Sequence, residues 1–298
     1  GIRDLVRSRG LGDVYKRQAG YEIVLLEKYT EKSQLLEAVA NVDAMIIRSD
    51  IADKKVLDAA KNLKVVVRAG AGFDNIDLKA ATANNIVAMN TPGQNSNAVA
   101  ELAFSMMLYM ARGGFNGKAG TELRNKTLGI HAYGNVGKHV AEIAKGFKMK
   151  IYSFDPFVKD SVIEADGVIP VGSVEELYKT CQYVSLHIPA NDKTRNSINK
   201  DLLSLMPKNA VLVNTARKEV IHEPDLLSIM EERQDFKYLS DIAPDCAAEF
   251  AEKYPGRYFF TPKKMGAQTA EANINAGIAA IKQIINFFEK GDVTYKVN

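Results

Sequence analysis

Short apolar runs alternate along the chain with longer stretches in which apolar residues recur every three or four positions. In the first third of the chain the apolar runs are four to six residues long and rich in valine, isoleucine and leucine, which predicts β-strands. The stretches between them have the spacing of amphipathic helices, and this alternation is typical of a parallel sheet covered by helices. The predicted strands are residues 21–26, 43–48, 63–68 and 86–89, and the clearest helices are residues 32–40 and 53–60.

Pro92 and Gly93 interrupt this rhythm, and a long apolar helix over residues 97–112 is predicted after them. A second series of strands and helices follows, and the chain ends with another long helix over residues 269–290. Two series of this kind predict two doubly wound parallel-sheet domains in the α/β class. The strands of the second series are predicted at residues 127–131, 149–154, 168–171, 183–187, 210–214, 237–241 and 257–260.

The composition narrows the class of protein. A chain of 298 residues and 32.7 kDa is long enough for two ordinary domains, and 46% hydrophobic with 25% charged residues is typical of a globular protein. Apolar runs fall short of the roughly 20 residues that a membrane span needs, so we expect no membrane partner. Cys181 and Cys246 are too few for a disulfide framework and lack zinc-site spacing, which predicts a reducing, cytoplasmic compartment and no metal.

The formal net charge of +3 comes entirely from the first 18 residues. This segment has five basic and two acidic side chains, whereas the remaining 280 residues have 34 of each. A basic arm that binds nucleic acid is one interpretation. Residues 13–18, DVYKRQ, are also what a transposon end used for sequencing libraries encodes, so we expect residues 1–18 to be non-native adapter sequence. The body of the protein is then neutral, and no nucleic-acid partner is expected.

A glycine-rich turn follows the first strand of the second series. Aligned with the dinucleotide-binding pattern G-x-G-x-x-G, its glycine positions are Ala132, Gly134 and Gly137, so the first glycine is replaced. We expect Ala132 to need only a tight turn with dihedral angles that alanine accepts. Gly134 lets the backbone approach a pyrophosphate, with Asn135 and Val136 at the start of the next helix.

An acidic residue stands 21 positions after Gly134. Asp155, at the end of the strand predicted over residues 149–154, would accept hydrogen bonds from both hydroxyls of a ribose and would repel a 2′-phosphate, which favours NAD over NADP. The alternative is a surface aspartate that caps the turn before Pro156.

Four further strings resemble the D-isomer-specific 2-hydroxyacid dehydrogenases. They occur in the same order as in the family, and the resemblance covers residue 19 to the end. The chain most resembles the short members that oxidise 3-phosphoglycerate and lack a C-terminal regulatory domain. The resemblance implies a Rossmann NAD-binding domain, residues 94–274, inserted in a flavodoxin-like substrate domain, residues 19–93 and 275–298. It also implies a homodimer. The four strings are residues 68–77 (RAGAGFDNID), 90–96 (NTPGQNS), 187–189 (HIP) and 214–217 (NTAR).

The same resemblance implies a strand, loop and helix before residue 21. The first strand is central in a flavodoxin-like order. We therefore expect the substrate domain to be N-terminally truncated, with open ladder edges at strands 21–26 and 43–48.

The reaction that the resemblance implies is NAD-dependent oxidation of a D-2-hydroxy acid. The leading substrate is 3-phosphoglycerate, converted to 3-phosphohydroxypyruvate in the first step of serine biosynthesis. One alternative is reduction of hydroxypyruvate, glyoxylate or another 2-keto acid. A different class of function is a non-catalytic NAD-sensing binding protein.

The resemblance also assigns residues to roles. Arg217 would hold the substrate carboxylate and polarise the carbonyl at C2, because a guanidinium makes bidentate contacts and stays charged. The backbone amides of Ala71 and Gly72 would complete that site, and Asn95 lies between the domains. The other implied contacts to NAD are His187, Pro189, Asn214, Thr215, Ala216, Asp241 and Gly266.

Two arginines are candidates for binding a substrate phosphate. Arg48 and Arg68 each end a predicted strand of the substrate domain. In the alternative interpretation, each is solvated or paired with Asp50 or Asp74.

The family's catalytic pair of histidine and glutamate is missing from the sequence. The histidine position falls on Lys264, beside Lys263, and the glutamate position falls on Cys246. We expect Lys264 to replace the histidine as general acid and base, with its pKa lowered by burial and by the charges of Lys263 and Arg217. The alternative is a lysine that faces solvent or pairs with a phosphate. Cys246 lacks a nearby histidine that would activate it as a nucleophile.

Overall fold

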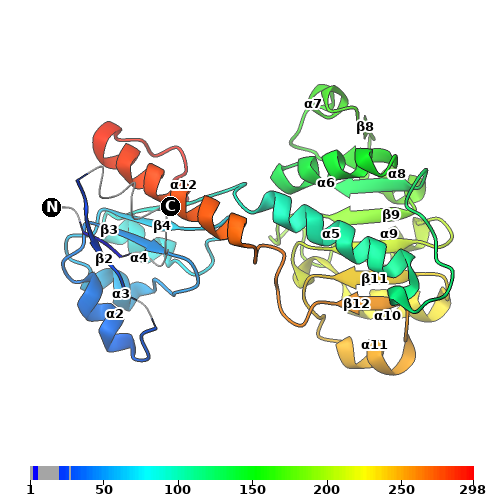
Figure 1. Ribbon diagram of the computed structural model, residues 1–298, viewed down its shortest axis with the longest axis horizontal. Helices are drawn as coiled ribbons and strands as arrows, with labels where there is room; N and C mark the ends of the chain where they lie inside the picture. The colour runs from blue at the N-terminus through cyan, green and yellow to red at the C-terminus, as the bar shows by residue number, and fades with distance from the viewer. Residues whose placement is uncertain (1–2, 6–19, 27) are drawn as a thin grey trace. The chain divides into compact units, whose positions relative to one another are not determined.

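The computed structural model describes residues 3–5, 20–26 and 28–298, and these form two compact units (Figure 1). The first unit comprises Gly1–Asn95 and Gln268–Asn298, and the second unit comprises Ser96–Ala267. The sequence placed the boundaries after residues 93 and 274, whereas the chain divides after residues 95 and 267, so the whole of the last helix lies in the first unit.

The first unit contains a five-stranded parallel sheet in the order β2-β1-β3-β4-β5. This is the flavodoxin-like order, in which the first strand is central. The strands are β1 (Arg3–Leu5), β2 (Glu22–Val24), β3 (Ala44–Ile47), β4 (Val65–Arg68) and β5 (Val87–Asn90).

The expectation of open ladder edges at strands 21–26 and 43–48 is wrong. Strand β1 pairs with both neighbours, with Leu5 opposite Val24 on one side and Met45 on the other. Ladder hydrogen bonds join backbone groups, so a segment of only three residues can fill this position. Residues 1–2 and 6–18, most of the segment interpreted as adapter sequence, lie outside the described residues.

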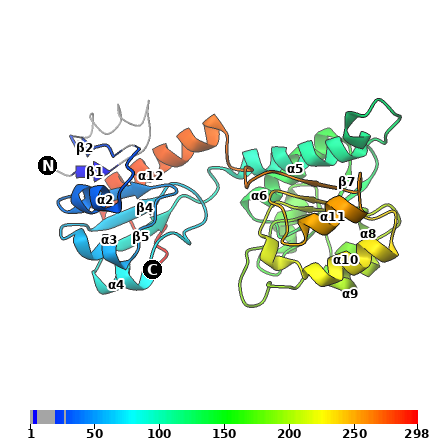
Figure 2. The same ribbon diagram turned by 90° about the horizontal axis from the view of Figure 1, so that it is seen from below.

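Side chains that alternate along the strands build a core on each face of this sheet. On one face, Met45 and Val66 pack with apolar residues of three short helices; on the other, Ile46 and Val67 pack with the last helix of the chain. Figure 2 shows this helix on the opposite side from the other three. The helices are α2 (Lys32–Val39), α3 (Lys54–Ala59), α4 (Leu78–Ala83) and α12 (Ala270–Lys290).

The second unit contains the predicted seven strands in one parallel sheet, in the order β12-β11-β10-β9-β6-β7-β8. The order reverses between β6 and β9, and this is the point where doubly wound sheets bind ligands. The strands are β6 (Thr127–His131), β7 (Lys150–Phe154), β8 (Ile169–Pro170), β9 (Tyr183–Leu186), β10 (Val211–Asn214), β11 (Lys237–Ser240) and β12 (Tyr258–Phe260).

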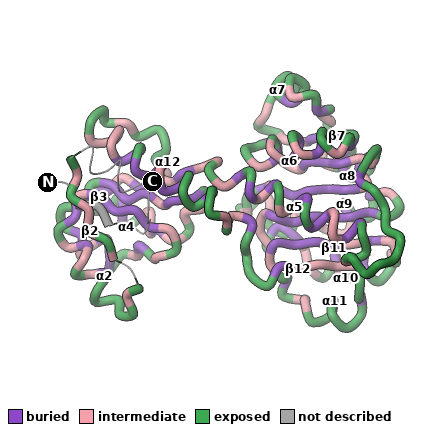
Figure 3. Tube along the Cα trace, viewed as in Figure 1, coloured by how far each residue is buried: buried purple, intermediate pink, exposed green. Residues whose placement is uncertain are grey.

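Helices cover both faces of this second sheet, and the central strands β9 and β10 are buried along their whole length (Figure 3). One core contains apolar residues of α5 and α6, and the other contains residues of α8 to α11. Among the described residues, no helix combines the length and apolar character that a membrane span requires. The helices are α5 (Ser96–Ala111), η1 (Gly113–Phe115), α6 (Asn135–Gly146), α7 (Asp160–Ala165), α8 (Val174–Thr180), α9 (Lys200–Leu205), η2 (Lys218–Val220), α10 (Glu223–Glu232) and α11 (Ala247–Lys253).

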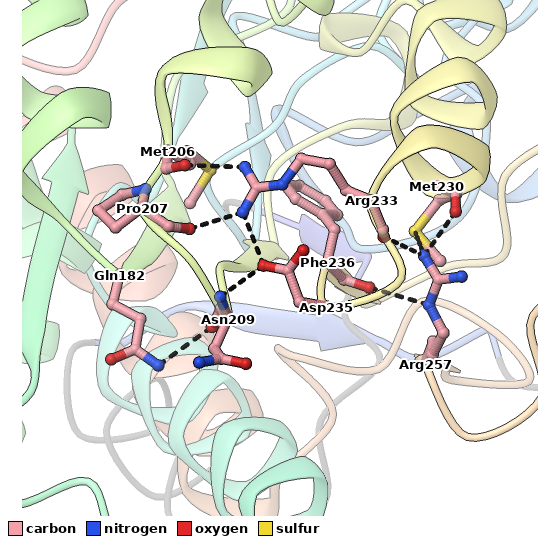
Figure 4. Close-up of polar contacts among 9 residues, drawn as sticks. All are labelled: Gln182, Met206, Pro207, Asn209, Met230, Arg233, Asp235, Phe236 and Arg257. Atoms are coloured by element: carbon pink, nitrogen blue, oxygen red, sulfur yellow. Dashed lines mark hydrogen bonds and ion pairs between the residues drawn. The ribbon is translucent and has the colours of Figure 1, made fainter.

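Two arginines tie together the loops at the amino edge of the second sheet (Figure 4). Arg233 donates to the backbone oxygens of Met206, at 2.8 Å, and Pro207, at 2.7 Å, just after α9. Arg257 donates to the backbone oxygens of Met230 and Arg233 near the end of α10, each at 2.6 Å. Cations satisfy helix C-terminal carbonyls well, because the helix dipole is negative there. This edge is therefore closed by structural contacts, and the opposite edge carries the candidate site.

Candidate functional site

The predicted cofactor residues come together at the carboxyl edge of the second unit's sheet. Parallel strands end at one edge, so the loops that follow β6, β7, β9, β10 and β11 meet there. The predicted substrate residues Arg48, Arg68, Ala71 and Gly72 lie at the corresponding edge of the first unit's sheet, and Asn95 is the last residue of the first unit's first segment.

The two glycines of the turn after β6 serve different purposes. A Cβ added to Gly137 would lie 2.4 Å from the Ala132 carbonyl oxygen, so helix α6 packs on the turn only because this residue is glycine. Gly134 is the N-cap of α6 with φ −81°, and a Cβ there would meet nothing within 4 Å. Neither packing nor backbone conformation requires glycine at this position. The open space before the N-terminal amides of α6 fits the pyrophosphate of a dinucleotide.

Ala132 does not have the dihedral angles that the sequence predicted for it. Its φ is +81°, in the left-handed region that favours glycine, where a Cβ costs roughly 1–2 kcal/mol. The replacement of the first glycine therefore leaves a strained turn. Residues in such conformations persist where the surrounding contacts fix them.

The carboxylate of Asp155 is held by two backbone amides. Its Oδ2 accepts from the Tyr133 N–H at 2.7 Å, and its Oδ1 accepts from the Phe157 N–H at 2.8 Å. The second contact is the turn cap of the alternative interpretation, so that role and ribose binding are compatible. Each carboxylate oxygen has further acceptor capacity, which fits the two hydroxyls of a ribose and not a 2′-phosphate.

Two neutral histidines lie at the ends of β6 and β9. His131 Nδ1 is 3.3 Å from the Tyr178 hydroxyl, and His187 Nδ1 is 3.4 Å from Thr215 Oγ1. Burial lowers the pKa of His131 to about 4, and burial, followed by the charge of His131, lowers the pKa of His187 to about 3. The Nε2 atom of His187 is buried and has no hydrogen-bond partner among the described residues. A polar ligand group at this edge would satisfy it.

Asn214 shapes the turn that carries Arg217. Its side chain donates to the Arg217 carbonyl oxygen and accepts from the Ala216 N–H, both at 2.9 Å. Sequence reasoning assigned Asn214 to NAD, and the structure uses both ends of its amide within the turn.

Arg217 and Lys264 converge on one atom. Arg217 Nη1 donates to the Ala216 carbonyl oxygen at 3.1 Å, and Lys264 Nζ donates to the same oxygen at 2.9 Å. The Lys264 side chain is exposed, so the burial that the sequence predicted for its ammonium group is not seen. The two cations therefore lie close together, and their combined charge would suit a small acid.

Asp241 holds the loop on which Lys264 lies. The buried carboxylate accepts from Thr261 Oγ1 at 3.0 Å and from the backbone N–H groups of Met265 and Gly266, each at 2.8 Å. A Cβ on Gly266 would lie 2.8 Å from Asp241 Oδ2, so this close approach requires glycine. Thr261 was not among the site residues predicted from the sequence, although its position directly after β12 could have indicated it.

A glutamate from another element fixes the loop in which the family's catalytic glutamate would stand. Glu223, at the start of α10, accepts from the N–H groups of Asp245 at 3.0 Å and Cys246 at 2.9 Å. Burial, and then Glu223, raise the pKa of the Cys246 thiol to about 12, which agrees with an unreactive thiol. Across the described residues, no cluster of three or more acidic, histidine or cysteine side chains is suited to a metal ion.

The two candidate phosphate-binding arginines of the first unit lie at the ends of neighbouring strands. Arg48 Nη1 is 3.4 Å from the Ala69 carbonyl oxygen, and Arg68 Nε donates to the Arg48 carbonyl oxygen at 3.2 Å. Burial lowers the pKa of Arg48. Gly70 has φ +152°, and a Cβ there would lie 1.7 Å from Arg68 Nη1, so the Arg68 guanidinium rests on this glycine.

Comparisons with known proteins identify relatives of the whole arrangement. The D-isomer specific 2-hydroxyacid dehydrogenase NAD-binding domain matches residues 99–249. The chain is 35% identical to a D-3-phosphoglycerate dehydrogenase of Methanocaldococcus jannaschii over 85% of this chain and 51% of that protein. It is 33% identical to a hydroxypyruvate reductase of Thermotoga maritima over 88% of this chain and 90% of that protein.

A solved structure of NAD+-bound 3-phosphoglycerate dehydrogenase from Entamoeba histolytica superposes with a TM-score of 0.87. It is 42% identical and covers 100% of this chain and 99% of that chain. The chain spans about half the length of the Methanocaldococcus protein that it matches.

The two buried histidines predict loss of stability in mild acid. In the unfolded chain their pKa is about 6.5, so below that pH the unfolded state binds protons that the native state does not. The contribution of the two histidines to the free energy of unfolding is complete above about pH 7. It falls by about 1.4 kcal/mol per pH unit for each histidine as the pH drops toward 4. Urea unfolding at pH 7, 6 and 5 measures this slope.

Replacing one histidine isolates its share of the slope. His131→Phe should lower the slope of the unfolding free energy by about 1.4 kcal/mol per pH unit. His139→Gln, at the half-exposed histidine of α6, is the matched control for removing an imidazole outside the buried pair. An unchanged slope in His131→Phe would mean that His131 titrates normally in the folded protein.

Proposed function

The chain belongs to the D-isomer-specific 2-hydroxyacid dehydrogenase family, and from this premise we propose that it oxidises 3-phosphoglycerate to 3-phosphohydroxypyruvate, with Lys264 as acid and base. The convergence of Arg217 and Lys264 on the Ala216 carbonyl oxygen carries the proposal, because it gathers a carboxylate binder and a proton donor at the cofactor edge. The family's cofactor is NAD, which fits the open space before Gly134 and the carboxylate of Asp155.

In the proposed reaction, Arg217 binds the carboxylate of the substrate. A guanidinium offers parallel N–H groups to two carboxylate oxygens and so fixes the orientation of C2. When bound at the turn after β6, NAD would supply the acceptor for the hydride that leaves C2 in the oxidation. Asn214 maintains the turn that orients Arg217, since its amide bridges the Ala216 N–H and the Arg217 carbonyl oxygen.

Lys264 moves the proton at the C2 oxygen. As a neutral amine it takes the hydroxyl proton in the oxidation, and as an ammonium it returns a proton to the alkoxide in the reduction. Its position depends on Asp241, which fixes the loop through Thr261, Met265 and Gly266. A lysine needs no carboxylate partner to act in this way, which is consistent with Cys246 at the family's glutamate position.

Arg48 and Arg68 support a phosphorylated substrate over an unphosphorylated one. Their side chains belong to adjacent strand ends in the first unit, where two guanidinium groups suit a dianion. The similarity to a hydroxypyruvate reductase, over nearly the whole of that protein, favours hydroxypyruvate as a second candidate. The homodimer, the cytoplasmic location and a place in serine biosynthesis belong to the same proposal.

Initial rates of NADH oxidation distinguish these substrates. We expect the kcat/KM for 3-phosphohydroxypyruvate to exceed those for hydroxypyruvate, glyoxylate and pyruvate by at least about tenfold, because only the first offers a phosphate to the arginines. Arg48→Met should reduce this ratio and leave the value for hydroxypyruvate nearly unchanged. Equal values for 3-phosphohydroxypyruvate and hydroxypyruvate would favour the reductase. Binding of NADH without turnover of any acid would favour the non-catalytic sensor.

Exchange of the two adjacent lysines tests the proton transfer. Lys264→Met should lower kcat by about 100-fold or more at saturating substrate and leave NADH affinity unchanged, because only the acid and base is removed. Lys263→Met removes an equal charge from the neighbouring exposed position and should lower kcat far less than Lys264→Met does, because the amine that moves the proton is still present. Wild-type turnover in Lys264→Met would exclude this lysine from the mechanism.

A further inference from the structure

We propose that Tyr133 is a positioning residue that holds the strained Ala132 turn in the shape needed to receive NAD. This inference rests on the proposed NAD site and adds a residue whose side chain lies behind it. Tyr133 stands between the first and second glycine positions of the turn, and its side chain is fully buried.

The turn needs an anchor because its first position is occupied by alanine. With φ +81°, Ala132 would relax toward an ordinary extended or helical angle if its neighbours allowed it. On its amino-terminal side the Ala132 N–H is bonded to the Phe154 carbonyl oxygen at 2.9 Å, which continues the ladder between β6 and β7. On its carboxyl-terminal side the Ala132 carbonyl oxygen packs against Gly137 of α6, and the next residue, Tyr133, supplies the hydrogen-bonded restraint.

Tyr133 is fixed at three points. Its ring belongs to the core formed with α5 and α6, and its hydroxyl donates to Asp166 Oδ2 at 3.1 Å. Its backbone N–H donates to Asp155 Oδ2 at 2.7 Å. Asp166 directly follows α7 and has its own N–H bonded to the Ile163 carbonyl oxygen, so the hydroxyl is tied to an element outside the turn.

This arrangement links the buried ring to the surface that the cofactor would touch. The Tyr133 N–H sets the direction of the Asp155 carboxylate, and the next residue, Gly134, opens the space before α6. If the hydroxyl contact is lost, the strain at Ala132 is less opposed and the Tyr133 N–H can rotate away from Asp155. The affinity for NADH should therefore fall, whereas the rate of proton transfer at Lys264, on the loop after β12, should stay the same.

The strain at Ala132 predicts a specific rescue. Glycine accepts φ +81° without strain, so Ala132→Gly removes the reason that the anchor is needed. A tyrosine that serves only to fill the core would show no such dependence on residue 132. The pair thus separates positioning from simple packing.

The experiment measures NADH binding to the full chain without substrate, by titration of NADH fluorescence. Tyr133→Phe should raise the Kd for NADH by about five- to tenfold, which is part of what one hydrogen bond to a charged group contributes, because the hydroxyl acts on the cofactor through the turn. Tyr133→Phe combined with Ala132→Gly should return it to within about twofold of the Ala132→Gly value. With the phosphorylated substrate, kcat at saturating NADH should stay within about twofold in both.

Two further variants control for stability. Tyr183→Phe removes the hydroxyl of another buried tyrosine, on β9, that pairs with Thr121, and should leave the Kd for NADH unchanged. Asp166→Ala removes the acceptor of the same hydrogen bond, the half-buried carboxylate of Asp166, and should cause the same loss of NADH affinity. This variant therefore tests the inference even if Tyr133→Phe does not fold.

Three results would contradict the inference or its premise. A wild-type Kd in both Tyr133→Phe and Asp166→Ala would overturn the positioning role. A weakened Kd that Ala132→Gly does not restore would also overturn it, because the tyrosine would then act through packing alone. Failure of the wild-type chain to bind NADH would overturn the cofactor site itself, and the inference with it.

Discussion

The parallel direction of all strands in the second unit is the constraint on which the site depends. Because neighbouring strands run the same way, each loop that follows a strand is delivered to one edge, and the reversal of order between β6 and β9 separates the loops there. The glycine turn, Asp155 and Arg217 come from three different strands and meet only for this reason. The opposite edge is closed by Arg233 and Arg257, which bind the carbonyl oxygens after α9 and near the end of α10.

Carboxylates organise the loops at the site by accepting backbone N–H groups. Asp155, Asp241 and Glu223 each receive two such bonds, and the amide of Asn214 bridges its own turn in the same manner. Hydrogen bonds from N–H groups to an ionised acceptor are stronger than those between neutral groups, so a few acidic side chains can fix long loops. The chemistry-bearing cations, Arg217 and Lys264, thereby lie on segments whose backbone is already fixed.

The sequence predicted the parts of this picture that depend on local pattern. The seven strands of the second sheet follow from apolar runs, and Gly134, Gly137 and Asp155 follow from their spacing around β6 and β7. It did not predict what depends on contacts between distant segments: the use of Asp241 by the Thr261–Gly266 loop, the role of Glu223, or the exposure of Lys264. The left-handed angle of Ala132 was missed because a pattern of residue types records the replacement of a glycine but not the backbone angle imposed there.

The central claim is that the turn after β6 and the carboxylate after β7 form a site for NAD. Calorimetric titration of the wild-type chain with NADH and with NADPH tests it most directly. Because Asp155 would face the ribose hydroxyls and repel a 2′-phosphate, NADH should bind at least about 100-fold more tightly than NADPH, and Asp155→Ala should remove most of this difference. Equal affinity for the two cofactors in the wild-type chain would contradict the account.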